Sequence, residues 1–432
     1  MNRRKFMQYT SAMLASSLVP AMASGSTHYV ASLVRFQAQL HTAKPGDTII
    51  LANGRYYINE PIIIACAGEE GNPIRILAES VGGVELTGTE GVSFHPGAAH
   101  IVFDGFRITH NVSRMHIRPG AHHIRIFRCD FKCPGRGAYF TVAGDDIEIA
   151  YNLFREKSRF GNMLDIRGAS GQVARRVWIH HNHFRDFSRS TVPTETNDLE
   201  VIRYGLSGLS MSMGHGMIEH NLFERCVGEN ELISNKSGGN TYRYNTFLDS
   251  PGSELSLRHG NECVAYHNYF HNTQGIRIFG DRHYIFENFI EEGSIGIHIG
   301  NGGGEVADGA PLTSHDRPDD NVITRNVLIN NDRQYFMAPR NNGLGAPRTT
   351  FTENILIGGN VAARIGGPYP DPVWRDNIVW NVREIGDMPE YAFRSIDPGV
   401  ITPESLGINI LTPADVGLAA KGLVYRRGKI QR

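Results

Sequence analysis

A short phrase recurs along this chain, and its period restricts the possible folds more than any other feature. Each copy is an alternating apolar segment, then Asn or Asp, then a large apolar side chain, as in IEIAYNLF from Ile147 and GMIEHNLF from Gly216. The marker residues are Asp130, Asn152, Asn182, Asn221, Asn245, Asn268, Asn288, Asn326, Asn354 and Asn377. The shorter steps between successive markers set the basic period, and the longer steps equal that period plus an inserted loop.

This period predicts an all-β fold, a right-handed parallel β-helix. Each coil of such a solenoid buries its inward side chains only by stacking on the next coil. Asparagine tolerates a left-handed corner, and its side chain can hydrogen-bond along a ladder of identical corners. A leucine-rich repeat would need its leucine consensus, which is absent, and a propeller would need blades of about 40 residues or more.

The two ends of the chain depart from the repeat. Leu33, Phe36 and Leu40 recur at helical spacing before Pro45, which predicts a short helix that caps the first coil of the solenoid. From about Ile401 the repeat is lost, so we expect residues 401–432 to form a C-terminal cap. The longest insertions are expected to form the walls of a groove; they are 185–211, 301–320 and 335–350.

The N-terminal segment 1–23 resembles a twin-arginine export signal. Arg3 and Arg4 precede an apolar stretch from Ala12 to Ala23 that ends in a small-x-small site. We therefore expect cleavage after Ala23, a single β-helix domain over 24–432, and a periplasmic or secreted protein. No later apolar run reaches the roughly 18 residues needed to span a bilayer, so no membrane span is predicted.

The overall charge restricts the choice of partner. A formal net charge of -1 gives no general basic field, so we expect no nucleic-acid binding. An anionic polysaccharide would have to be bound by a local patch of arginines. We expect a monomer or weak dimer. The five cysteines show no metal-binding spacing, which favours buried thiols, with a single disulfide as the alternative.

The segment from Glu229 to Arg258 carries the strongest candidates for chemistry. Glu229 and Glu231 share one face of a strand, because side chains alternate. Lys236 is the only lysine between Lys157 and Lys421. Arg258 follows Lys236 by one period, which predicts the amine directly beneath the guanidinium. Lys236 breaks the parity of the two glutamates, so a corner near Ser234 and Asn235 is required.

A metal site is one interpretation of the acidic residues in this segment. Asn197 precedes Glu229 by one coil plus an insertion, so its side chain can lie beside Glu229 and Glu231. Carboxylate and amide oxygens suit Ca²⁺ better than zinc. The alternative is that Glu229 and Glu231 are ordinary surface residues.

Three segments resemble signature blocks of polysaccharide lyase family 6, which contains alginate lyases and the dermatan-cleaving chondroitinase B. These segments are NDLEVIRYG from Asn197, ENELISNKS from Glu229 and LRHGN around Arg258. The resemblance extends over the whole mature chain, and the Asn repeats alone would fit many pectin-lyase-like solenoids. It implies that Lys236 is the base, that Arg258 is the acid, and that Asn197, Glu229 and Glu231 hold Ca²⁺.

Four further residues are candidates for contact with the substrate. Arg203, His215 and Arg282 could bind substrate carboxylates, and Arg203 lies within a matched block. His259 follows Arg258, but on a regular strand its side chain would point to the opposite face.

The function predicted from these features is a secreted lyase that cleaves a polyuronate, alginate first, by β-elimination. Lys236 would take the C5 proton, Arg258 would act as acid or stabilise charge at O4, and Ca²⁺ would neutralise the uronate carboxylate. The alternatives are a dermatan or chondroitin sulfate lyase, a hydrolase with paired aspartates, and a non-catalytic carbohydrate-binding solenoid.

Overall fold

The structure is a computed structural model, and it describes residues 25–110, 115–133 and 135–420. The predicted export signal, residues 1–23, lies outside the described residues. Among the helices of the described chain, none is both long and apolar enough to cross a bilayer.

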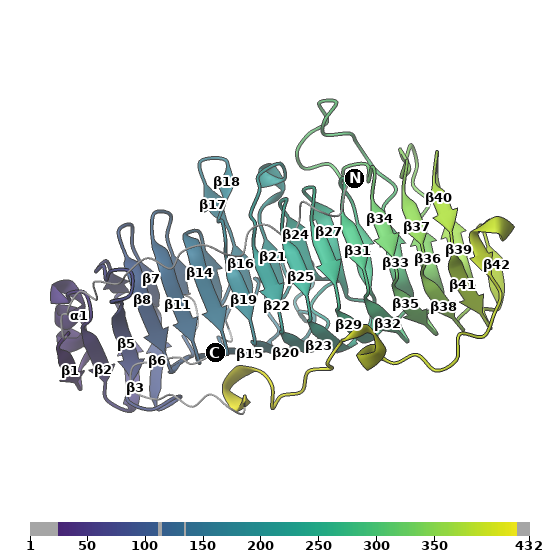
Figure 1. Cartoon of the computed structure of the whole chain (residues 1–432). Coiled ribbons are helices and arrows are strands. Elements are labelled where there is room, and N and C mark those ends of the chain that lie inside the picture. Colours follow the sequence, from purple (N-terminus) through teal and green to yellow (C-terminus); the bar gives the residue numbers. More distant parts are fainter. Residues whose placement is uncertain (1–24, 111–114, 134, 421–432) are drawn as a thin grey trace, which may run out of the picture.

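The chain forms a right-handed parallel β-helix, as predicted, in which three sheets run the length of the molecule (Figure 1). We name them sheets A, B and C, and each coil passes through them in that order. Within a sheet, every strand pairs in parallel with the equivalent strand of the neighbouring coil, as β24 (Glu231–Lys236) does with β27 (Glu254–His259).

Sheet A has 14 strands: β1 (Thr27–Val30), β2 (Thr48–Leu51), β5 (Ile74–Ala78), β8 (Ala99–Asp104), β11 (His122–Phe127), β14 (Asp145–Ala150), β19 (Trp178–His180), β22 (Met217–Glu219), β25 (Thr241–Arg243), β28 (Val264–Tyr266), β31 (Tyr284–Phe286), β34 (Val322–Thr324), β37 (Thr350–Thr352) and β40 (Val373–Arg375). Sheet B also has 14: β3 (Gly54–Ile58), β6 (Val84–Gly88), β9 (Phe106–Ile108), β12 (Asp130–Phe131), β15 (Leu153–Lys157), β20 (His183–Phe187), β23 (Leu222–Cys226), β26 (Thr246–Ser250), β29 (Tyr269–Thr273), β32 (Phe289–Glu291), β35 (Val327–Ile329), β38 (Ile355–Ile357), β41 (Asn377–Trp380) and β43 (Phe393–Arg394).

Sheet C has 13 strands: β4 (Ile62–Ile64), β7 (Val92–Phe94), β10 (Met115–Ile117), β13 (Phe140–Val142), β16 (Leu164–Ile166), β21 (Ile202–Tyr204), β24 (Glu231–Lys236), β27 (Glu254–His259), β30 (Ile276–Ile278), β33 (Ile295–Ile299), β36 (Arg333–Met337), β39 (Val361–Ile365) and β42 (Glu384–Gly386). The remaining elements are helix α1 (Leu33–Thr42), a hairpin of β17 (Gly168–Ala169) and β18 (Gln172–Val173), and the short helices η1 (Ser207–Leu209), η2 (Glu390–Ala392), η3 (Pro403–Leu406) and η4 (Gly417–Ala419).

The interior of the solenoid is filled by stacked side chains of like kind. Under sheet B, six phenylalanines of successive coils stack with ring centroids 4.6, 4.7, 4.9, 4.7 and 4.4 Å apart; they are Phe131, Phe154, Phe184, Phe223, Phe247 and Phe270. Because equivalent residues lie above one another, each coil shields the core of the next.

The predicted ladder of asparagines is present at the turn from sheet A to sheet B. Its members are fully buried: Asn152, Asn182, Asn221, Asn245, Asn268, Asn288, Asn326, Asn354 and Asn377. At each step the Oδ1 atom accepts from the backbone N–H and the side-chain amide of the preceding asparagine, as Asn245 does from Asn221 at 3.1 and 3.0 Å. The ladder therefore satisfies polar backbone groups that burial would otherwise leave unpaired.

Two details of the repeat differ from prediction. The left-handed conformation belongs to the residue before each asparagine, such as His220 (φ 51°) and Tyr244 (φ 53°), because the asparagine itself must point inward to reach its neighbours. Asp130 is not a ladder member. Asp130 pairs with Leu153, and its carboxylate binds two arginines. Cys129 takes the asparagine position instead and donates its backbone N–H to Asn152.

Helix α1 (Leu33–Thr42) confirms the predicted N-terminal cap. The Ser32 hydroxyl accepts from the backbone N–H of Arg35, which starts the helix, and Phe36 and Leu40 are buried against the first coil. The Gln37 amide bonds the carbonyl and N–H of Ile63 at 2.7 and 3.0 Å, which satisfies an edge of β4. The helix thus covers an open end of the solenoid.

Residues 401–420, the described part of the predicted C-terminal cap, do not cover the end of the solenoid. The chain runs back from the last coil along the outer face of sheet B, as Figure 1 shows in yellow. Ile408 packs with Tyr269, Phe289 and Val327, and the backbone N–H of Leu411 donates to Thr246 at 3.0 Å. The returning segment thus shields apolar side chains on the outer face of sheet B from water. At the end of the solenoid itself, η2 packs beside β40.

The five cysteines are free thiols, and all but the half-buried Cys66 are buried, as the preferred interpretation predicted.

At the turn from sheet C to sheet A, His283 takes a buried position equivalent to those of Asn240 and Asn321, and its titration makes stability depend on pH. His283 Nδ1 accepts from the N–H of Cys263 at 2.9 Å and Nε2 donates to the carbonyl of Phe279 at 2.8 Å, so the neutral ring is fully paired. Burial lowers the pKa of His283 to about 4. The unfolded chain, with a histidine pKa of about 6.5, binds more protons between these values, so stability falls as the pH drops through this window.

We expect His283→Asn to reduce this loss by about 1.5 kcal/mol between about pH 6.5 and pH 5, since asparagine can still accept from Cys263. Urea unfolding at both pH values measures it. A variant whose acid sensitivity equals that of the parent protein would contradict the assignment.

Candidate active site

Three carboxylates meet where β21 and β24 begin. Glu200, Glu229 and Glu231 each offer an oxygen, and these atoms lie within 4.8 Å of one another. Glu200 and Glu231 are buried, and the amide of Asn162 donates to Glu200 at 2.6 Å. Burial and the two neighbouring glutamates raise the pKa of Glu229 to about 8. We call these residues the carboxylate group.

Lys236 lies at the end of β24 and reaches the carboxylate group. Its Nζ donates to Glu200 Oε1 at 3.3 Å, and the residue is 8% exposed. The amine is therefore largely buried and lies beside the carboxylate group, away from bulk solvent.

Arg258 reaches the same group from the next coil. Its Nη1 donates to Glu231 Oε1 at 2.8 Å, and 34% of its side chain is exposed. Its Nε has no hydrogen-bond partner among the described residues. The guanidinium thus keeps donor capacity for a further ligand.

Two irregularities in the pairing of β24 with β27 bring these side chains together. Glu231 pairs with Glu254 and Ile233 with Leu255, so Leu232 is an extra residue; Asn235 pairs with Leu257 and Lys236 with His259, so Arg258 is extra. These β-bulges correct the prediction of a corner at Ser234 and Asn235, since β24 runs unbroken through both residues. They also correct the register, because the partner of Lys236 is His259 and not Arg258.

The second bulge also changes the position of His259. The ring is buried, and neither nitrogen has a hydrogen-bond partner among the described residues. Burial, together with the nearby Arg258, His315 and Lys236, lowers the pKa of His259 to about 3. His315 comes from the 301–320 insertion and lies 5.9 Å from the His259 ring. His259 therefore faces the site, contrary to the expectation for a regular strand.

The insertions border the site as predicted. The His315 ring stacks on Phe279 at 4.5 Å and contacts Arg340 Nη1 at 3.4 Å, so the loops after β33 and β36 meet here. Residues 335–337 belong to β36. The 185–211 insertion begins with the last residues of β20, and the loop that follows lines a cavity of about 310 Å³ beside Glu229. The insertion then passes through β21 and ends in a segment that contains η1.

The other predicted site residues lie at different distances from the carboxylate group. Asn197 is exposed in the bend before Glu200, and Glu200 takes the place predicted for it in the group. Arg203 is buried beside Ser234, but Asp165 and Asp198 bind its guanidinium. His215 is exposed on the corner before β22, near Gly239.

Arg282 lies farther along the surface and does not join the group. Half of its side chain is exposed, and it donates to Glu262 at 3.0 Å. Arg282 and Glu262 occupy equivalent corners of adjacent coils, one above the other. Their ion pair follows from this stacking and does not indicate a bound ligand.

Glu200 and Arg277 belong to the site but were missed in the sequence. Arg277 binds Glu231, contacts Glu254 at 3.1 Å and donates to Ser256 Oγ at 3.0 Å. Ser234, Ser256 and Arg277 form one row on sheet C, each one period after the last, so counting periods from Ser234 would have found it. Glu200 lies in the matched block NDLEVIRYG but had no distinguishing spacing.

A family model described as Chondroitinase B matches residues 30–344. Among solved structures, the PL6 family alginate lyase AlyGC has a TM-score of 0.74 at 23% identity, over 86% of this chain and 53% of that chain. A PL6 alginate lyase in complex with a trisaccharide has a TM-score of 0.76 at 20% identity, over 92% of this chain and 96% of that chain. A mannuronic acid specific family 6 lyase from human gut microbiota has a TM-score of 0.72 at 22% identity, over 87% of this chain and 92% of that chain. This chain thus spans about half of AlyGC. No curated protein matches it.

The match to the family model spans more than half of the sequence and, together with the β-helix, places the protein among the polysaccharide lyases. Within this class, the chain belongs to polysaccharide lyase family 6, the family of chondroitinase B. The resemblance noted in the sequence is confirmed.

Proposed function

We propose that this protein cleaves alginate by β-elimination, with Lys236 as base and Arg258 beside the leaving oxygen. The observation that carries the proposal is the convergence of both side chains on one carboxylate group, through Glu200 and Glu231. The alginate lyases among the structural neighbours support alginate as the substrate.

Elimination requires removal of the C5 proton next to a carboxylate, whose charge resists formation of a carbanion. Lys236 is a primary amine and can accept this proton in its neutral form. Arginine is a poor acid in proteins, so we assign Arg258 to stabilise negative charge at O4 while water supplies the proton to the leaving group. We further propose that His259, whose buried ring nitrogens have no hydrogen-bond partner among the described residues, contacts the sugar.

The carboxylate group fits Ca²⁺. Three carboxylates whose oxygens lie within 4.8 Å of one another supply the hard oxygen donors that Ca²⁺ prefers. We propose that Glu200, Glu229 and Glu231 hold the ion, with Asn197 from the adjacent bend as a fourth donor. A bound Ca²⁺ would neutralise the uronate carboxylate.

We further propose, from the N-terminal sequence, that the protein is exported to the periplasm or secreted, and that it acts as a monomer or weak dimer on its anionic polymer.

A dermatan sulfate lyase is the second candidate, and two observations favour it. The matching family model is that of chondroitinase B. In addition, Arg333, Arg364 and Arg383 line a cavity of about 630 Å³ along sheet C, where sulfate groups could bind.

Ultraviolet absorbance separates these functions, since each elimination creates a 4,5-unsaturated uronate. We expect an absorbance rise with mannuronate or guluronate blocks and none with dermatan sulfate. The reverse result would establish the second candidate, and no rise with either polymer would exclude both.

Removal of metal is expected to lower the rate on alginate. After treatment with a chelator and its removal, we expect an activity loss of about 10-fold or more that Ca²⁺ reverses. Glu229→Gln should raise the Ca²⁺ concentration needed for half-maximal activity, whereas Glu262→Gln, a change at an exposed glutamate paired with Arg282, should not. Full activity of the chelated protein would contradict a role for Ca²⁺.

A further inference from the structure

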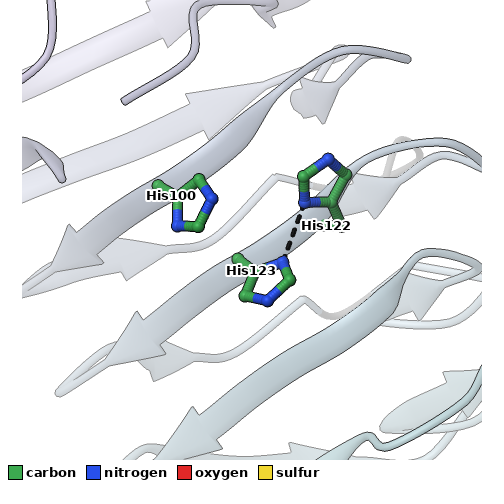
Figure 2. A group of neighbouring side chains, drawn as sticks. All are labelled: His100, His122 and His123. Carbon is green, nitrogen blue, oxygen red and sulfur yellow. Dashed lines mark hydrogen bonds between the residues drawn. The ribbon is translucent and has the colours of Figure 1, made fainter. Parts of the chain in front are cut away.

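Three histidines gather on the outer surface where the chain enters sheet A, on two adjacent coils (Figure 2). His100 lies near the start of β8, and His122 and His123 open β11. Figure 2 shows the three rings side by side on neighbouring strands. None of them contributes to the site on β24 and β27.

The backbone holds the rings close together. His100 (φ 49°) and His123 (φ 52°) are both left-handed, so they occupy equivalent corners of successive coils. Their rings stack with centroids 4.7 Å apart, and the His122 ring lies edge-on to both, at 5.9 and 5.0 Å. The cluster is therefore fixed by the repeat of the solenoid.

The nitrogen positions suit a shared cation. One ring nitrogen from each histidine lies within 4.8 Å of the other two. The Nδ1 atoms of His122 and His123 are 2.8 Å apart. Two nitrogens bound tetrahedrally at 2.0–2.1 Å would be about 3.3 Å apart, so a small rotation of the rings would accommodate an ion.

The surroundings add oxygen atoms that could serve as ligands. A cavity of about 260 Å³ beside the cluster is lined by His100, His123 and the acidic residues Glu69, Glu70 and Asp146. Glu69 and Glu70 are exposed, whereas Arg176 binds the Asp146 carboxylate at 2.6 and 2.7 Å. A carboxylate or water can thus complete four-coordination.

We propose that His100, His122 and His123 form a binding site for a divalent transition metal ion of the zinc type, separate from the catalytic site. Neutral imidazole is a preferred ligand of Zn²⁺, whereas Ca²⁺ prefers oxygen, so the two sites select different ions. The bound ion would link two coils near the N-terminal cap.

A second histidine pair provides a matched control. His180 and His181 also place their Nδ1 atoms 2.9 Å apart, and His181 (φ 52°) has the same left-handed backbone. There, however, Glu148 binds His180 Nε2 at 3.2 Å. Of the described residues, this pair is not part of any three-ligand cluster.

The test is calorimetric titration of the full, untagged protein with ZnCl₂ at about pH 7, in excess Ca²⁺ to occupy oxygen sites. We expect one site in the parent protein and in His181→Asn. His123→Asn and His100→Asn should each bind at least about 10-fold more weakly, and asparagine tolerates the left-handed corner. At about pH 5, where free histidines are protonated, binding by the parent should be lost.

Circular dichroism verifies that each variant is folded, and Co²⁺ gives an independent readout. Visible absorption of bound Co²⁺ typical of nitrogen ligation, lost in both cluster variants and retained in His181→Asn, would support the site even if one variant failed to fold. Equal Zn²⁺ affinity in the parent and the folded cluster variants, or no Zn²⁺ binding by the parent, would overturn the proposal.

Discussion

Lys236→Arg is expected to lower the initial rate of β-elimination by about 10²–10⁴-fold while the β-helix remains folded. Arginine retains the positive charge and can still pair with Glu200, which Lys236 binds at 3.3 Å. It cannot give up its proton at working pH, so it cannot serve as the base. The substitution therefore separates base catalysis from simple charge pairing. The rate is measured as ultraviolet absorbance of the unsaturated product.

Lys132→Arg is the matched control, because Lys132 is partly exposed and pairs with Glu156 outside the carboxylate group. It should retain the parental rate. If Lys236→Arg kept a substantial part of the activity, Lys236 would only be a charge partner of Glu200, and another group would have to take the C5 proton.

Asn245→Ala is expected to cause the largest change in stability that we predict. The Asn245 amide donates to the carbonyl of Ile218 at 2.9 Å, and its Oδ1 accepts from the backbone N–H of Asn221 at 3.1 Å. Alanine would leave both buried backbone groups without these partners, and each loss should destabilise the protein by about 1–3 kcal/mol. Urea unfolding followed by circular dichroism measures the combined loss.

Asn360→Ala is its control, since Asn360 lies on the same solenoid but bonds Asp332 at an exposed position. Its effect should stay within about 0.5 kcal/mol. A loss for Asn245→Ala no larger than that of the control would show that the ladder contributes little to stability.

The repeat made the fold predictable from sequence. A repeat of this short period can bury its apolar side chains only by stacking, so Phe184, Phe223 and Phe247 had to lie above one another. The residue that adopts the left-handed corner was misassigned, because a recurring Asn marks the corner without saying which of its residues turns. The C-terminal segment has no repeat, and its path along sheet B depends on apolar residues from several distant coils.

The carboxylates and cations of the site were recognisable as residue types, but their contacts depended on register. Counting periods placed Lys236 under Arg258, whereas two bulges pair it with His259 and turn both Arg258 and His259 toward the site. A bulge is set by local packing against the neighbouring strand, and no period in the sequence reports it.

The sequence by itself determined the solenoid, the capping helix and the residues Glu229, Glu231, Lys236 and Arg258, because each follows from periodicity or from a short motif. Only the tertiary structure decided that Glu200 completes the carboxylate group, that Arg277 holds Glu231, and that Arg282 lies apart. These outcomes depend on loop lengths and strand offsets between coils, which fix distances in space that linear spacing leaves undetermined.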